Sequence, residues 1–118
     1  MGRIEDFFAE RERLNQEVLA RADLPTKRFF ALDNDAYREG ALPRKVKELM
    51  GLVASLVLRC DDCVTYHLAK AVEAGAKTEE IVEAMGIALI VGGSIVIPHL
   101  RRAYALLDEL EGSEVGGA

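Results

Sequence analysis

The stretch KELMGLVASLVLRCDDCVTYHLAKAVEAG, residues 47–75, decides the fold. Its first half repeats apolar residues at helical spacing, and Pro43 before it suits the first turn of a helix, where a missing amide hydrogen costs little. A further helix is expected to begin near Cys60 or Asp61 and to stop at Gly75, because Asp61 and Asp62 suit the positive end of a helix dipole. The residues expected to point inward from the first of these helices are Val46, Leu49, Met50, Val53 and Val57.

Two more helices are expected before this stretch. Apolar residues recur at helical spacing among many charges from about Arg3 to Ala22, which predicts an amphipathic helix. After Pro25 the chain restarts, and a second helix should close at Gly40, a residue suited to the left-handed conformation that ends helices. This second helix is expected to pass through Phe29, Phe30 and Tyr37.

Helices also follow the stretch. Thr78 is expected to cap a fifth helix, and residues 92–94, Gly-Gly-Ser, separate it from a sixth that runs to about Leu110. Pro98 would either kink the sixth helix or mark its true start. No alternating period-two run indicates a strand. The sequence therefore predicts an all-α, compact single domain of about six helices over residues 1–111, followed by a flexible C-terminal tail over residues 112–118.

Composition limits the function classes. The 118 residues fit one domain, half of them are apolar, and the net charge is −5 with acids and bases interleaved, so no basic stripe is available for nucleic acid. The N-terminus lacks the apolar stretch of a signal peptide. Residues 84–100 carry no charge but contain Gly and Pro and fall short of the ~20 apolar residues that span a bilayer. We expect a cytoplasmic protein without membrane or nucleic-acid partners.

The two cysteines of the chain lie close to a histidine. On a helix, Cys60, Cys63 and His67 share one face, and the cysteine backbones would be about 5 Å apart, within the range of a disulfide. A helix N-terminus and His67 favour a thiolate, whereas Asp61 and Asp62 oppose it. In a reducing compartment such a pair is more often catalytic or metal-binding than structural.

Glu48 is a fourth candidate. It lies twelve residues before Cys60, away from the apolar stripe, on a helix face shared with Gly51 and Ser55, whose small size permits close approach of another helix. If the two helices of residues 47–75 pack antiparallel, Glu48 faces His67. A carboxylate beside a histidine fixes its tautomer and raises its basicity, as expected of the general base of a thiol.

The run from Lys47 to Gly93 resembles the carboxymuconolactone decarboxylase superfamily, and within it the alkylhydroperoxidase D-like branch. The shared signature is Glu, eleven residues, Cys-x-x-Cys-x-x-x-His, then Gly-Ala, an acidic helix start and Gly-Gly; the resemblance covers about Leu42 to Leu110. It implies an all-helical fold, a cysteine pair that cycles between dithiol and disulfide, and a proton relay. The residues onto which these catalytic roles fall are Glu48, Cys60, Cys63 and His67.

The resemblance also implies an activity and partners. We expect an antioxidant thiol peroxidase or disulfide reductase, acting on a hydroperoxide or a protein disulfide, supplied by a thiol reductant or redox partner protein, without a cofactor. It also implies trimers, or hexamers built from smaller units, and the apolar segment 84–97 together with four phenylalanines supports a homo-oligomer. One departure weakens the peroxidase expectation: some members carry a histidine between the cysteines, where this chain has Asp61 and Asp62.

Three alternatives remain open. Cys60, Cys63 and His67 are also suited to a metal-binding or redox-sensing module without turnover. Lactone chemistry of the decarboxylase type is a further alternative, although it needs no cysteine pair. The chain could also be a helical assembly subunit with incidental cysteines. His99 has no predicted partner and is interpreted as structural, and Tyr66 as a packing residue.

Overall fold

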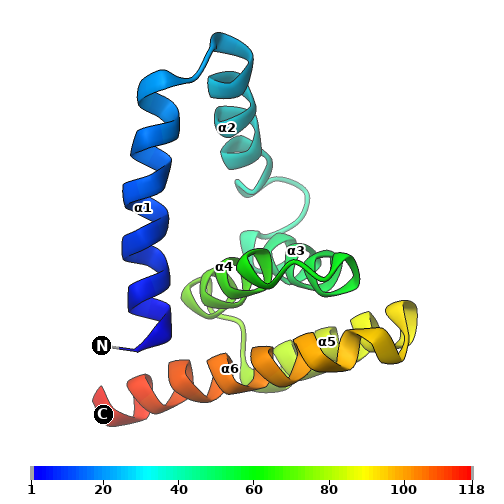
Figure 1. Ribbon diagram of the computed structural model, residues 1–118. Helices are drawn as coiled ribbons and strands as arrows, with labels where there is room; N and C mark the ends of the chain where they lie inside the picture. The colour runs from blue at the N-terminus through cyan, green and yellow to red at the C-terminus, as the bar shows by residue number, and fades with distance from the viewer. Residues whose placement is uncertain (1, 118) are drawn as a thin grey trace.

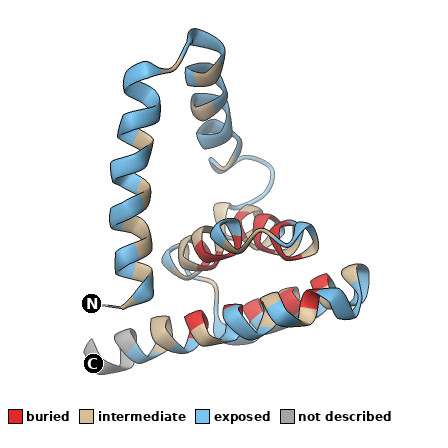
Figure 2. Cartoon of the chain, viewed as in Figure 1, coloured by how far each residue is buried: buried red, intermediate tan, exposed pale blue. Residues whose placement is uncertain are grey.

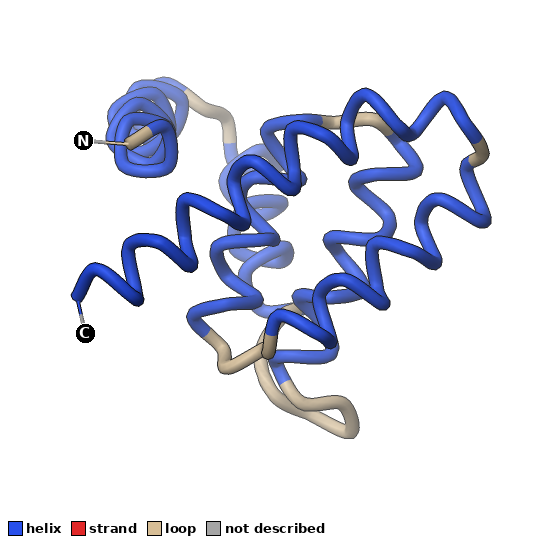
Figure 3. Tube along the Cα trace, turned by 90° about the horizontal axis from the view of Figure 1, so that it is seen from below, coloured by secondary structure: helices blue, strands red, loops and turns tan. Residues whose placement is uncertain are grey.

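Six α-helices and one short 3-10 helix make up the described chain. The computed structural model describes the backbone of residues 2–117 and the side chains of residues 2–112, and no strand occurs within them (Figure 3). The elements are α1 (Arg3–Arg21), α2 (Leu24–Ala36), α3 (Arg44–Leu58), α4 (Asp61–Glu73), α5 (Thr78–Gly92), η1 (Ser94–Val96) and α6 (Ile97–Gly117). The all-α prediction is confirmed.

The helices form two parts with different burial. Helices α3 to α6 pack around one core, whereas α1 and α2 form a hairpin that projects from it (Figure 1). No residue of α1 or α2 is buried, and the buried positions gather on the other helices (Figure 2). The core residues are Leu52, Leu56, Val64, Leu68, Ile81, Met85, Ala88, Val96, Ala103, Leu106 and Leu107.

The joint between α3 and α4 places the cysteine pair. Arg59 ends α3 in the left-handed region, with φ 61°, a conformation that costs a residue other than glycine on the order of 1 kcal/mol. Its amide and that of Cys60 donate to carbonyls of the last turn of α3. Because the turn is this tight, Cys60 becomes the N-cap of α4 directly after α3 has ended. Gly75, with φ 95°, follows α4 as predicted.

The base of the projecting hairpin is tied to α6. The Glu109 carboxylate accepts hydrogen bonds from the amides of Ile4, at 2.9 Å, and Arg3, at 3.3 Å, so a negative charge satisfies free donors at the positive end of α1. One turn farther along, the Phe8 ring lies 6.1 Å from the Tyr66 ring of α4, measured between centroids. These contacts hold the start of α1 beside α4.

Several predicted helix boundaries were wrong. The second helix ends at Ala36 rather than Gly40, because Lys47 of α3 donates to the carbonyls of Ala36, at 2.9 Å, and Arg38, at 2.6 Å, and so satisfies acceptors at its end. Thr78 is the first residue of α5 rather than its cap: Lys77 is the cap, and its amide donates to Glu80.

The end of the chain extends the predicted sixth helix. Pro98 lies in the first turn of α6, so it marks the start of this helix rather than a kink. The helical backbone continues beyond Leu110 to Gly117. The predicted flexible tail, residues 112–118, falls mostly outside the described side chains, and its flexibility stays a prediction.

The predicted inward stripe of α3 is confirmed in part. Leu49, Val53 and Val57 are partly buried and pack against the core, whereas Met50, expected inside, is 56% exposed. Leu52 and Leu56, outside the predicted stripe, are fully buried. The stripe also borders an open apolar groove of about 660 Å³ between α3 and α5. The face with Glu48, Gly51 and Ser55 is the one that packs against α4, because its small residues admit a neighbouring helix.

Candidate active site

The cysteine pair lies at the first turn of α4. Cys60 and Cys63 form a disulfide with their Cα atoms 5.3 Å apart, in agreement with the separation predicted from helical spacing. The amide of Cys63 donates to Cys60 Sγ at 3.3 Å, so the N-cap role of Cys60 is filled by sulfur. Cys63 is exposed and Cys60 only partly so. The two sulfurs therefore differ in their access to solvent.

Glu48 and His67 are brought together across α3 and α4. Glu48 Oε1 lies 2.8 Å from His67 Nδ1, and Glu48 is 1% exposed, not a solvated surface charge. Arg44, one turn earlier on α3, places its Nε 3.6 Å from the other carboxylate oxygen. Because the carboxylate accepts the Nδ1 proton, Nε2 of the neutral ring is left as the acceptor. The predicted pairing is present in the structure.

Tyr37 completes this group, and the sequence analysis assigned it no role in the site. Its hydroxyl lies 3.4 Å from His67 Nε2, a distance at which the O–H donates weakly to that nitrogen, and the two rings stack at 5.1 Å. Burial raises the pKa of Tyr37, and the carboxylates of Asp33 and Glu48 raise it further, so the phenol stays protonated at neutral pH. Tyr37 comes from the end of α2, thirty residues away, so no local pattern could have paired it with His67.

Gly51 makes room for these rings. A Cβ atom built there would lie 2.8 Å from Tyr37 Oη and 2.9 Å from two atoms of the His67 imidazole, closer than real Cβ contacts. The predicted close approach at Gly51 is thus made by the two side chains that flank Glu48. Only glycine fits at this position without displacing one of them.

The cysteine and the histidine open onto one cleft. A cavity of about 550 Å³ lies between the α1–α2 hairpin and α4, and Cys63 and His67 are both on its wall. The Arg11 guanidinium covers the Tyr66 ring at 4.1 Å, and burial raises the pKa of the Tyr66 phenol. Tyr66 packs between Phe8 and His67, in keeping with its predicted packing role. The remaining cleft residues are Phe7, Glu10, Leu14, Asn15, Asp33 and Asp62.

His99 has a partner that the sequence did not predict. Its Nδ1 lies 2.7 Å from Asp61 Oδ1, and Arg102 Nη1 lies 2.9 Å from Asp61 Oδ2. No partner was predicted for His99, and this one is available because the start of α6 runs beside the start of α4. Spacing on α6 places His99 and Arg102 one turn apart, but nothing in the sequence directs them to Asp61.

Two other kinds of site are absent from the described part of the chain. Among the side chains of residues 2–112, no group of three or more His, Cys, Asp or Glu is arranged to hold a metal ion. No helix within residues 2–117 is long and apolar enough to cross a membrane.

Known structures share this fold. Two crystal structures from Thermotoga maritima superpose with TM-scores of 0.93 and 0.91 at 60% identity, covering 95% of this chain and 98% and 95% of theirs. One of them is described as a carboxymuconolactone decarboxylase family protein with a suggested part in an antioxidative response. A Legionella pneumophila protein of the same family gives a TM-score of 0.68 at 27% identity, covering 92% of this chain and 90% of that one.

Sequence relatives agree with the structural ones. An uncharacterised protein of the cox locus of Paracoccus denitrificans is 32% identical over 85 residues, 72% of this chain and 77% of its own length. An uncharacterised protein of Cupriavidus necator is 33% identical over 82 residues, 70% of this chain and 73% of its own. Residues 23–106 match the carboxymuconolactone decarboxylase family. The similarity therefore includes α2, whereas the motif alone placed its start at about Leu42. The chain belongs to the carboxymuconolactone decarboxylase family, and its cysteine signature agrees with the alkylhydroperoxidase D-like branch.

Proposed function

We propose that this protein is a thiol-dependent oxidoreductase that reduces hydroperoxides or disulfides through Cys60 and Cys63. One observation carries the proposal: an exposed cysteine, in a disulfide with its neighbour, shares a cleft with a histidine held by a buried carboxylate. The Thermotoga maritima relative, with its suggested part in an antioxidative response, supports the same class of activity.

The reaction balances with a hydroperoxide and a dithiol. The Cys63 thiolate attacks the terminal oxygen of ROOH, the O–O bond breaks, and the alkoxide leaves as ROH after taking a proton, so Cys63 becomes a sulfenic acid. The Cys60 thiol then attacks that sulfur and releases water, which forms the disulfide. A dithiol reductant restores both thiols and is itself oxidised to a disulfide. A disulfide substrate would enter by the same attack, with a thiolate as leaving group.

Attack is assigned to Cys63. It is exposed, lies on the cleft wall and is one helical turn from His67, whereas Cys60 is partly buried. The position of Cys60 at the helix N-cap favours a thiolate there too, but a nucleophile must also be reached by its substrate. Cys60 is therefore assigned the resolving step.

The base is assigned to His67. With Nδ1 donating to Glu48, the acceptor nitrogen Nε2 is available to take the thiol proton of Cys63, and the buried carboxylate stabilises the imidazolium that forms. The Tyr37 hydroxyl lies 3.4 Å from the same nitrogen and helps to fix the orientation of the ring. Because burial keeps the Tyr37 phenol protonated, its hydroxyl can donate to Nε2 while the ring is neutral, and its oxygen can accept from Nε2 once the imidazolium has formed.

The proposal is tested on reduced, desalted protein under anaerobic conditions. Addition of tert-butyl hydroperoxide, or of an oxidised dithiol peptide, should consume two thiols per chain and give an intramolecular disulfide by mass spectrometry. In the Cys60→Ser variant, a sulfenic-acid reagent should label Cys63. Label on Cys60 in the Cys63→Ser variant alone would reverse the assignment. Thiol loss no faster than that of a small free thiol, with both oxidants, would leave the metal-binding or sensing alternatives in its place.

A further inference from the structure

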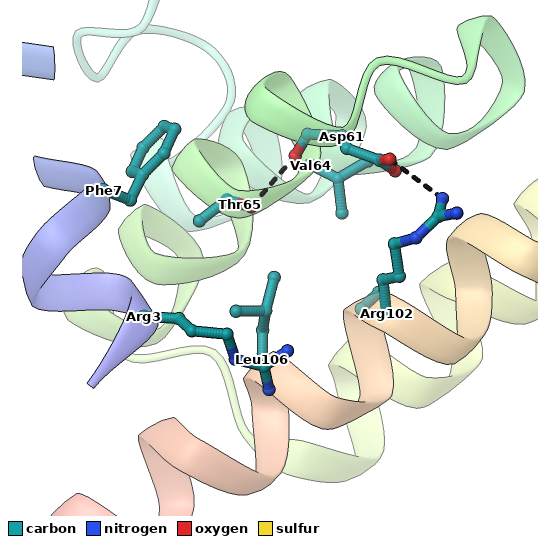
Figure 4. A pocket seen from close by; sticks show the side chains of 8 residues that line it. Arg3, Phe7, Asp61, Val64, Thr65, Arg102 and Leu106 are labelled. Atoms are coloured by element: carbon teal, nitrogen blue, oxygen red, sulfur yellow. Dashed lines mark hydrogen bonds and ion pairs between the residues drawn. The ribbon is translucent and has the colours of Figure 1, made fainter. Parts of the chain in front are cut away.

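Asp61, one of the two residues between the cysteines, is bound by side chains of another helix. Asp61 receives His99 on one carboxylate oxygen and Arg102 on the other, and both partners lie at the start of α6 (Figure 4 shows the Arg102 contact). The His99 side chain is 19% exposed, against 45% for Asp61 and 57% for Arg102, so the histidine is the more enclosed partner. The adjacent Asp62 is exposed and makes no hydrogen bond or ion pair among the described residues.

The location of Asp61 gives this contact a chemical consequence. Asp61 is the first residue of α4, and the helix N-terminus is the feature that favours a thiolate at Cys60 and Cys63. A free carboxylate at that position repels a thiolate. A carboxylate already bound by donors of a guanidinium and an imidazole repels it less, because its charge is balanced nearby.

Other charged groups also face the sulfurs. On α4 these are Asp62 and His67, and Arg59 directly precedes Cys60. The cleft around Cys63 adds Glu10 and Arg11 from α1 and Asp33 from α2. These charges of both signs are spread around the cleft, whereas Asp61 lies in the turn that holds both cysteines and is the one carboxylate of that turn bound by two side chains from α6.

We propose that His99 and Arg102 are positioning residues that hold Asp61 so that the Cys60–Cys63 pair is easier to reduce and its thiols ionise more readily. This inference rests on the proposed function for its purpose, but it concerns a property of the thiols that exists whether or not peroxide is the substrate. It also explains how the pair tolerates an acidic residue at the first position of α4.

The expected effects have a defined sign. Removal of the Arg102 guanidinium leaves the Asp61 charge less balanced, so the thiol pKa should rise by roughly half a unit, the size expected for one unit charge several ångströms away in a partly exposed site. Loss of the His99 hydrogen bond should raise the thiol pKa in the same direction by a smaller amount. Above the thiol pKa the rise of roughly half a unit is about a threefold change in the dithiol–disulfide equilibrium, or roughly 15 mV toward a more negative potential. Asp61→Asn should shift both quantities in the opposite direction.

The variants separate a chemical role from a structural one. Arg102→Gln removes the guanidinium, and Arg101→Gln is its matched control, because Arg101 is exposed on the same helix and makes no ion pair among the described residues. His99→Leu removes the imidazole donor, and His99→Asn should restore much of the effect because its amide nitrogen lies near the position of Nδ1. In an Asp61→Asn background, His99→Leu should have little further effect.

The measurements use the full chain. The thiol pKa is read from the thiolate absorbance of the reduced protein against pH, and the potential from equilibration with a glutathione redox buffer. Raised pKa and lowered potential in Arg102→Gln and His99→Leu, with Arg101→Gln unchanged, support the inference. A change in thermal unfolding without a change in either thiol property would overturn it and leave a structural ion pair. Failure of peroxide reduction would overturn the proposed function but not this inference.

Discussion

Gly51→Ala should disable the candidate base while leaving the helices in place. The added methyl would lie 2.9 Å from two ring atoms of His67 and 2.8 Å from the Tyr37 hydroxyl, whereas ordinary contacts begin near 3.4 Å. Both side chains must therefore retreat, each by about 0.5 Å. Tyr37 meets the methyl with the far end of its side chain, but the His67 ring is fixed by Glu48 at 2.8 Å.

Two opposing effects set the change in stability. Alanine improves helix propensity over glycine by about 1 kcal/mol, and overpacking costs typically about 1–3 kcal/mol. The free energy of unfolding should therefore fall by no more than about 2 kcal/mol. The rate of peroxide-dependent thiol loss should fall more, by about tenfold to a hundredfold, because a displacement of this size misaligns the histidine with its thiol.

Gly86→Ala is the matched control for this variant. Gly86 is also a helical glycine, in α5, but a Cβ atom there would meet nothing within 4 Å. This substitution should stabilise the protein by about 0.5–1 kcal/mol and leave the rate unchanged. A second variant, Gly51→Ala with Tyr37→Phe, removes one of the two clashes and should recover part of the stability. Wild-type oxidation rates in Gly51→Ala would refute the close packing that the structure describes.

The remaining predictions concern the relay, the tyrosine and the assembly. Thiol oxidation should slow by about a hundredfold to ten-thousandfold in each of the variants Glu48→Gln and His67→Gln, with the fold intact. Cys63→Ser should leave essentially no reaction. Unchanged rates in the Glu48 and His67 variants would remove the relay from the mechanism. Tyr37→Phe should cost about fivefold, the value of one neutral hydrogen bond of about 1 kcal/mol. Because burial raises its pKa above 10.0, the wild-type rate profile should show no ionisation of Tyr37 below that pH. We also expect a homo-oligomer whose interface covers the apolar groove beside Met50. A mass near 12.9 kDa from light scattering of the wild type would contradict this expectation. Met50→Glu should lower the measured mass.

Local signals in the sequence were sufficient for most of the fold and for the four candidate site residues. Helix starts follow from acidic and proline positions that act within one turn, so the start of α4 could be predicted, whereas Pro98 left a kink and a start of the sixth helix as alternatives. Glu48 and His67 could be paired because a short joint forces α3 and α4 to be neighbours. Both residues also belong to the cysteine motif that carries the family resemblance. The inward face of α3 could not be read from apolar spacing alone, since its buried side includes a carboxylate and a glycine.

Tyr37 and His99 were missed for a common reason. Each reaches the site from a helix whose position depends on tertiary packing, with 30 residues between Tyr37 and His67 and 38 between Asp61 and His99. Neither belongs to the spacing that marks the cysteine motif. A single sequence contains no signal for such pairs, because hydrophobic periodicity reports only which face of a helix is buried and not which neighbour it meets.

The projecting hairpin links the candidate chemistry to the rest of the molecule. Helices α1 and α2 contribute no buried residue, yet they supply most of the cleft wall opposite Cys63 and the Tyr37 hydroxyl at His67. On α2, Phe29 is 66% exposed and Leu32 is 65% exposed, an unusual location for large apolar side chains on a helix with no core of its own. The hairpin is held at the start of α1 by Glu109 and Tyr66 and at the end of α2 by Lys47 and His67, so these contacts set the position of the cleft wall. The width of the cleft and the direction of the Tyr37 hydroxyl thus depend on the same packing.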